Sequence, residues 1–167
     1  EFAWLLGYFV AEWFYHERQT VTRYARFTSA KKRFLLERVQ RFCQAHGISC
    51  SRIRENNQGF NIDVWDLQSV WKQCYFYSHR RLPAKKIKRV PHFVFSWCNE
   101  AKQAFIDGFV AGDGNTQTIT QIFNTSQFVL QGINLLAHSL SNKSITVSWV
   151  KGFKDGCFAS YITNPKH

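Results

Sequence analysis

The chain has 167 residues, enough to bury a core in one domain or in two small fused halves. Its 22 Lys and Arg and 11 Asp and Glu give a formal net charge of +11, which favours a polyanionic partner. We expect no membrane span, because no apolar run of about 18 residues is present. Five cysteines without the spacing of a disulfide scaffold indicate a reducing intracellular compartment.

The first half of the chain predicts the order helix, hairpin, helix, hairpin, helix. Helical spacing of apolar residues predicts the helix over 30–45, and Gly47 ends it. The turn at 56–59 separates two strand patterns, and Asp66 is a candidate helix cap. The expected elements are a helix over 2–12, a hairpin over 13–28 with its tip near 17–20, a helix over 30–45, strands over 51–55 and 60–64, and a helix from Asp66 to about Tyr77.

The second half repeats this order with a shorter first hairpin. Thr125-Ser126 matches Thr28-Ser29 at an offset of 97, whereas the helices at 3–12 and 104–113 match at an offset of 101. The first hairpin of the second half is therefore four residues shorter. The last hairpin is expected from strands over 144–150 and 156–163, and no counterpart of the 66–77 helix follows. We interpret the chain, which contains no Met, as part of a longer precursor.

Small residues recur every four positions in the two matching helices. They are Ala3, Gly7 and Ala11 in the first and Ala104, Gly108 and Gly112 in the second. Positions four apart lie on one helix face, and small side chains let two backbones approach closely. Packing in register would bring together the acids that end the helices, Glu12 and Asp113.

Two carboxylates at the C-terminal ends of helices repel each other and the negative end of each helix dipole. Either one of them binds a proton, or a hard divalent cation neutralises the pair. The second alternative predicts a metal-dependent hydrolase. Its Mg²⁺ ions would be held by Glu12, Asp113 and the backbone carbonyls of Ala11 and Gly112, and would activate water.

The two motifs resemble the LAGLIDADG motif of homing endonucleases. The segment from Phe105 to Asn115 (FIDGFVAGDGN) is a close match, and WLLGYFVAE, ending at Glu12, matches until Trp13 replaces the preferred Gly. A single copy is more often a packed helix with a polar end, but two copies aligned at four positions favour the family. Phe27-Thr28-Ser29, His46-Gly47-Ile48 and Lys88-Arg89-Val90-Pro91 add to a resemblance to the double-motif, single-chain branch, which includes endonuclease domains of inteins.

This resemblance implies an α+β fold of two pseudo-two-fold-related αββαββ(α) halves joined at the paired motif helices. We place the halves at 1–79 and 100–167, with a basic linker over 80–99. The implied function is site-specific, Mg²⁺-dependent cleavage of double-stranded DNA by a monomer, encoded within an intein or an intron. Two or three divalent ions would be shared between the motif acids, and the target would be long and asymmetric.

The antiparallel sheets are expected to form a DNA-binding saddle, because alternation puts polar side chains on the face opposite the helices. A two-stranded ribbon fits the major groove, where Arg reads guanine and Gln or Asn reads adenine. A solvated strand face is the alternative. The candidate residues are His16, Arg18, Gln19, Arg23, Arg26, Arg52 and Arg54 in the first half and Gln117, Thr118, Thr120, Gln121, Asn124, Ser148, Lys151 and Lys154 in the second.

Charge is concentrated in the first part of the chain, with 17 basic and 8 acidic residues in 1–100 against 5 and 3 in 101–167. Within the linker, six of the ten residues from Arg80 to Arg89 are basic. Pro83 and Pro91 limit helix there, so we expect an extended strap on DNA phosphates, with contacts from Arg80, Arg81, Lys85 and Lys86. A solvated linker and an import signal remain alternatives.

Members of this family commonly carry a Gln or Lys directly after the Thr that ends the second strand, where this chain has Ser29-Ala30. They often carry a Lys three residues beyond the motif acid, where this chain has Tyr15 and Thr116. Lys31 or Lys32, or Arg81 or Lys85, are candidates to replace them. The alternative function is a noncatalytic DNA- or RNA-binding module, such as a maturase or a degenerate endonuclease. Self-splicing is not expected. Cys43, His46 and Cys50 have a spacing that suggests zinc, but a buried thiol at Cys43 is favoured because no second half-site follows.

Overall fold

A computed structural model describes most of the chain. The described residues are 1–12, 14–17, 23–29, 32–57, 59–78, 85–116, 120–140, 143–144, 148–150 and 157–163. The helices are α1 (Phe2–Glu12), α2 (Arg33–Ala45), α3 (Gln68–Gln73), α4 (Asn99–Asp113) and α5 (Gln127–Ser139), with a 3-10 turn η1 (His92–Ser96). The strands are β1 (Phe14–Glu17), β2 (Arg23–Ser29), β3 (Arg54–Asn56), β4 (Gly59–Val64), β5 (Tyr75–Ser78), β6 (Lys85–Lys88), β7 (Gly114–Thr116), β8 (Thr120–Asn124), β9 (Lys143–Ser144), β10 (Ser148–Val150) and β11 (Cys157–Thr163).

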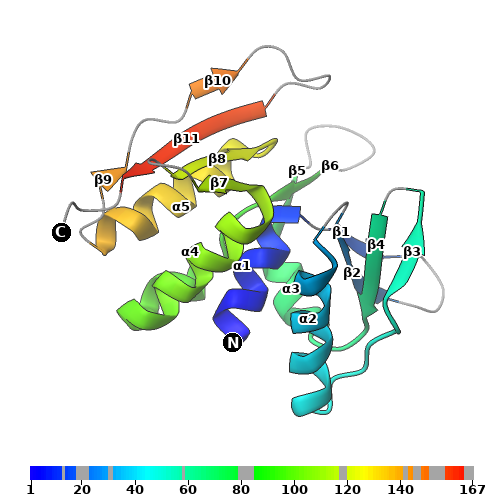
Figure 1. Ribbon diagram of the computed structural model, residues 1–167. Coiled ribbons are helices and arrows are strands. Elements are labelled where there is room, and N and C mark those ends of the chain that lie inside the picture. Colours follow the sequence, from blue (N-terminus) through cyan, green and yellow to red (C-terminus); the bar gives the residue numbers. More distant parts are fainter. Residues whose placement is uncertain are drawn as a thin grey trace.

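The two motif helices, α1 and α4, lie against each other between the two larger sheets (Figure 1). A Cβ atom added at Gly7 would lie 1.9 Å from the carbonyl oxygen of Phe105. One added at Gly108 would lie 2.0 Å from the carbonyl oxygen of Trp4. Backbone therefore touches backbone, and any side chain at either glycine would force the helices apart. At the offset of 101, Gly7 corresponds to Gly108 and Trp4 corresponds to Phe105. The two contacts are therefore equivalent, and the helix pair has the predicted pseudo-two-fold symmetry.

The first half carries a four-stranded antiparallel sheet in the order β1-β2-β4-β3. Phe27 on β2 faces Ile62 on β4, and both are fully buried with Val64 on the side covered by α2. The Phe27 ring also lies beside the rings of Phe9 and Trp71. Because strand side chains alternate, Arg26 and its partner Asp63 point to the opposite face, away from α2.

The second half carries a sheet in the order β10-β11-β8-β7, with β9 paired to β11. Helix α5 packs on β8 and β11, with Leu130, Ile133 and Leu136 buried. Figure 1 shows α2 and α5 each lying beside the sheet of its own half. The repeated order of elements and the α+β fold class are confirmed.

One prediction for the segment between the halves is wrong. Helix α3 ends at Gln73, and Tyr75–Ser78 forms strand β5 instead of a continuing helix. The described part of the basic segment is extended, as expected, but it pairs with β5 as strand β6, with Tyr75 opposite Lys88. Three consecutive aromatic residues, Tyr75, Phe76 and Tyr77, favour a strand once a partner is available.

Asp66 does not cap α3. Its carboxylate accepts a hydrogen bond of 2.6 Å from the backbone N–H of Ser49, and Leu67, with φ of 64°, precedes the helix. Cys43 is fully buried, as predicted, and among the described residues no group of three His, Cys, Asp or Glu side chains that could hold a metal is present. No helix within the described ranges is long and apolar enough to span a membrane.

Candidate active site

The structure brings the two motif acids together, because Glu12 is the last residue of α1 and Asp113 is the last residue of α4. A Cβ atom added at Gly112 would lie 2.7 Å from Cβ of Ala11 and 2.8 Å from Cγ of Glu12. The Glu12 side chain thus lies directly on the backbone next to Asp113. The close approach predicted from the small residues positions both carboxylates at one end of the helix pair.

Both carboxylates have a raised pKa. Burial is the main cause for each, and for Asp113 the neighbouring charge of Glu12 adds to it. Lys88 and Lys32 oppose the increase at both acids, and a hydrogen bond from Asn124 also opposes it at Asp113. Two acidic and two basic groups therefore face one another at this end of the helix pair.

Lys88 places a buried ammonium group at this site, from the end of strand β6. Its Nζ lies 3.4 Å from the carbonyl oxygen of Val10 and 3.3 Å from that of Ala11. Burial lowers the pKa of Lys88, and the charges of Asp113 and Glu12 oppose that decrease. The sequence did not place Lys88 at the active site, because this lysine stands in a run of basic residues and the spacing does not reveal which one turns inward.

Lys32, which precedes α2, supplies the second ammonium group. Its Nζ donates a hydrogen bond of 2.9 Å to the carbonyl oxygen of Ala111. Val10 and Ala111 occupy equivalent positions in the two motifs, so each lysine reaches the C-terminal carbonyls of one motif helix. Those carbonyls carry the negative end of the helix dipole, which favours an ammonium group there.

This fold is also found in solved protein structures. No protein-family model matches the sequence, and no curated protein matches it. A structure of I-DmoI in complex with DNA and Mn covers 96% of this chain and 88% of its own, with a TM-score of 0.68 at 13% identity. The chain has the LAGLIDADG fold.

Two further solved structures extend this likeness. The N-terminal LAGLIDADG domain of DUF199/WhiA covers 97% of this chain and 73% of its own, with a TM-score of 0.56 at 12% identity. I-WcaI bound to its DNA recognition sequence covers 96% and 74%, with a TM-score of 0.55 at 13% identity. The resemblance drawn from the two LAGLIDADG motifs is thereby confirmed for the fold.

Asn124 was predicted on the saddle, and this prediction is wrong. Its side chain is buried, and its Nδ2 donates to Oδ2 of Asp113 at 2.7 Å and to the carbonyl oxygen of Ala11 at 3.4 Å. Its Oδ1 accepts a hydrogen bond of 2.9 Å from the N–H of Ser126. Asn124 shares the inner face of β8 with the buried Ile122, so it turns towards the LAGLIDADG helices and fixes one oxygen of Asp113.

The residues at this site fit a divalent cation with hard oxygen ligands. Two carboxylates and the carbonyl oxygen of Ala11 converge there, and Mg²⁺, Mn²⁺ and Ca²⁺ prefer such ligands. On the side of Asp113, the carbonyl oxygen of Ala111 accepts a hydrogen bond from Lys32, and the metal ligand at the carbonyl of Gly112 stays a prediction. Among the described residues, no third acid, His or Cys joins Glu12 and Asp113 to form a metal-binding group, so water and substrate oxygens would complete the coordination.

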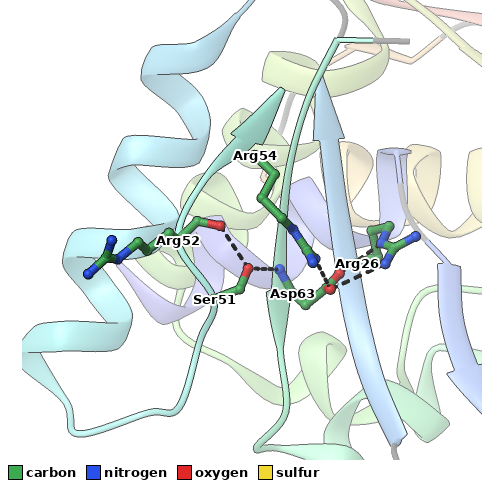
Figure 2. Close-up of polar contacts among 5 residues, drawn as sticks. All are labelled: Arg26, Ser51, Arg52, Arg54 and Asp63. Atoms are coloured by element: carbon green, nitrogen blue, oxygen red, sulfur yellow. Dashed lines mark hydrogen bonds and ion pairs between the residues drawn. The ribbon is translucent and has the colours of Figure 1, made fainter. Parts of the chain in front are cut away.

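The predicted saddle residues are only partly brought together. Arg26 and Arg54 meet at Asp63, whereas Figure 2 shows Arg52 pointing away from them. Gln121 is half-buried on β8, and several others are placed through their strands alone: His16, Arg23, Lys85, Lys86, Thr120 and Ser148. Nine predicted residues lie outside the described ranges: Arg18, Gln19, Lys31, Arg80, Arg81, Gln117, Thr118, Lys151 and Lys154.

Proposed function

We propose that this chain is a divalent-metal-dependent endonuclease that cuts both strands of a long, asymmetric site in double-stranded DNA. The observation that carries the proposal is the meeting of Glu12 and Asp113 at one end of two helices in backbone contact. Two similar proteins were solved with DNA, I-DmoI with Mn and I-WcaI with its recognition sequence, which supports the same partner here. The net charge of +11 suits such a polyanion.

In this proposal Glu12 and Asp113 bind the metal, and Mg²⁺ is the expected physiological ion. When bound, the metal would polarise the DNA phosphate and lower the pKa of a water molecule. Lys88 and Lys32 each hold positive charge close to the acids, where they offset negative charge that develops on the phosphate. Asn124 orients Asp113 through one carboxylate oxygen and leaves the other for the metal.

The resemblance to the double-motif branch supports finer proposals. These are that the chain acts as a monomer, that two or three ions are shared between the acids, that it functions inside the cell and that an intein or intron encodes it. The halves at 1–79 and 100–167 would each cover one half of the target.

A noncatalytic DNA- or RNA-binding module is the second candidate. Ser29-Ala30 and Thr116 stand where many family members carry an amide or a base, which favours this alternative. In addition, Lys88 places a positive charge beside the acids, where a cation would bind.

A cleavage assay distinguishes the two candidates. A DNA target is first selected by binding from a randomised double-stranded library, and the selected DNA is then incubated with Mg²⁺ or with EDTA. We expect cleavage only with Mg²⁺, and none with Glu12→Gln or Asp113→Asn. Asp107→Asn is the matched control, because Asp107 is an exposed acid on the same helix, bonded to Gln103. Tight binding without cleavage by the unaltered chain would support the module instead.

A further inference from the structure

The outer face of the first sheet carries a buried acid, Asp63, on the central strand β4. This face lies opposite the one that α2 covers, because Ile62 and Val64 on either side of Asp63 point into the core. Under the proposed function it is the face that meets DNA. A carboxylate there repels phosphate and loses hydration when buried, so its presence requires a reason beyond affinity.

Two arginines from neighbouring strands cover this carboxylate (Figure 2). Arg26 on β2 donates from Nε to Oδ1 at 2.8 Å and from Nη2 to Oδ2 at 3.2 Å. Arg54 on β3 donates from its own Nη2 to Oδ2. The side chain of Asp63 is 6% exposed, against 37% for Arg26 and 52% for Arg54, so the acid lies beneath two guanidinium groups that reach the surface.

The backbone holds the acid in place. The N–H of Asp63 donates to Oγ of Ser51 at 3.0 Å, and the N–H of Ser51 donates to the carbonyl oxygen of Asp63 at 2.8 Å. Arg26 is directly opposite Asp63 in the ladder between β2 and β4. Side chains from three strands thus meet at one carboxylate, with two hydrogen bonds fixing the guanidinium plane of Arg26 and one holding Arg54 beside it.

A fixed guanidinium plane matters for reading bases more than for holding phosphates. Arginine contacts guanine through two parallel hydrogen bonds to O6 and N7, which require a defined plane, whereas a phosphate accepts from many directions. A carboxylate that restrains two arginines lowers the net positive charge of this face of the sheet and orients the guanidinium groups. Orientation at the expense of charge favours sequence recognition over phosphate binding.

Among the residues that the structure describes, the second half shows no such cluster at the equivalent position. At the offset of 97, Phe123 on β8 corresponds to Arg26, and its partner in the ladder is the fully buried Ala159. Neither residue carries a charge. The arrangement at Asp63 is therefore particular to the first half and is not a requirement of the fold.

We propose that Arg26 and Arg54, held by Asp63, form a guanine-reading pair in the major groove of the half-site covered by the first sheet. Asp63 is the positioning residue of this pair. The inference rests on the proposed binding of double-stranded DNA and names which base the first half prefers.

The test compares DNA sequences selected from a randomised double-stranded library by the full chain and by its variants. The unaltered chain should enrich guanine at one or two positions in one half of the selected site. Asp63→Asn should weaken that preference roughly 10-fold while leaving the other half of the site unchanged, because one bidentate contact discriminates by about this factor. Glu37→Gln is the matched control, since Glu37 pairs with Arg33 on α2, away from the outer face of the sheet.

Arg54→Lys provides a second variant that keeps the charge and removes the planar donor pair at an exposed position. It should lose the guanine preference, again roughly 10-fold, with an unchanged dependence of affinity on salt. An unchanged preference in Asp63→Asn or in Arg54→Lys would overturn the inference but not DNA binding. If the unaltered chain enriches no sequence at all, the proposed function fails and this inference fails with it.

Discussion

The two halves of the molecule share a fold, yet their equivalent positions carry different chemistry. Phe27 in the first half packs among aromatic rings, whereas its counterpart Asn124 donates to the carboxylate of Asp113. On the outer faces the relation reverses, with Arg26 and Asp63 in the first half and Phe123 and Ala159 in the second. At these paired positions the polar groups lie on the outer face in the first half and at the acid centre in the second.

Only part of the pseudo-symmetry between the halves is required by the fold. Gly7 and Gly108 make equivalent contacts, since each touches a carbonyl oxygen of the other helix. At the carboxylates themselves the equivalence ends. Within the described residues no hydrogen bond to the carboxylate of Glu12 is seen, whereas Asp113 has one from Asn124. The backbone symmetry positions the two acids, and the neighbouring side chains make them unequal.

The largest expected effect comes from breaking the symmetric contact. Gly7→Ala and Gly108→Ala should each lower the free energy of unfolding by about 3 kcal/mol or more, because a Cβ would overlap backbone that cannot move alone. Chemical denaturation measures both. Gly47→Ala, where φ is +63° but no atom lies within 4 Å, should cost only about 1 kcal/mol. Unequal losses at Gly7 and Gly108 would contradict a symmetric interface.

Removing the buried ammonium group tests how far the acids depend on it. Lys88→Met should slow the proposed DNA cleavage by about 100-fold with little change in DNA affinity, because the positive charge acts at the reacting phosphate. Single-turnover cleavage and equilibrium binding are measured together. Lys102→Met, on α4 at a distance from the acids along the helix, should leave both unchanged. An equal loss of binding would place Lys88 among the affinity contacts instead.

The inequality of the acids can be tested by strand. Asn124→Ala removes the hydrogen bond to Asp113 and should slow cleavage of one DNA strand about 10-fold more than that of the other. Target DNA labelled separately on each strand reports both rates. Equal slowing of the two strands would mean that Asn124 supports the whole site and not one acid.

The smallest effect is a pH-dependent gain in stability. The pKa of Asp113 is raised in the folded chain, so ionisation of this group costs stability as pH increases through that raised value. Asp113→Asn removes the cost and should stabilise the metal-free chain by about 1 kcal/mol at pH 8, with a smaller gain at pH 5, where Asp113 is protonated. Denaturation in EDTA at both pH values measures it. A larger gain at pH 5 would contradict the direction of the shift.

Local spacing in the sequence was sufficient to predict the helix pair. Small residues four apart define one helix face, and an acid at the end of each motif must then fall at the same end of the pair. The order of elements follows from the same repetition, and the LAGLIDADG fold was implied by the resemblance of both motifs to that family. These features depend on neighbours along the chain, which the sequence displays directly.

What the sequence alone left undecided depends on pairing between distant segments. Tyr75–Ser78 became a strand because Lys85–Lys88 lies alongside it, and that pairing turned Lys88 towards the acids. Asn124 faced inward, and Asp63 came to lie under two arginines, because strand register decides which face each side chain takes. A shift of one residue in either ladder reverses that choice, so only the tertiary structure could determine it.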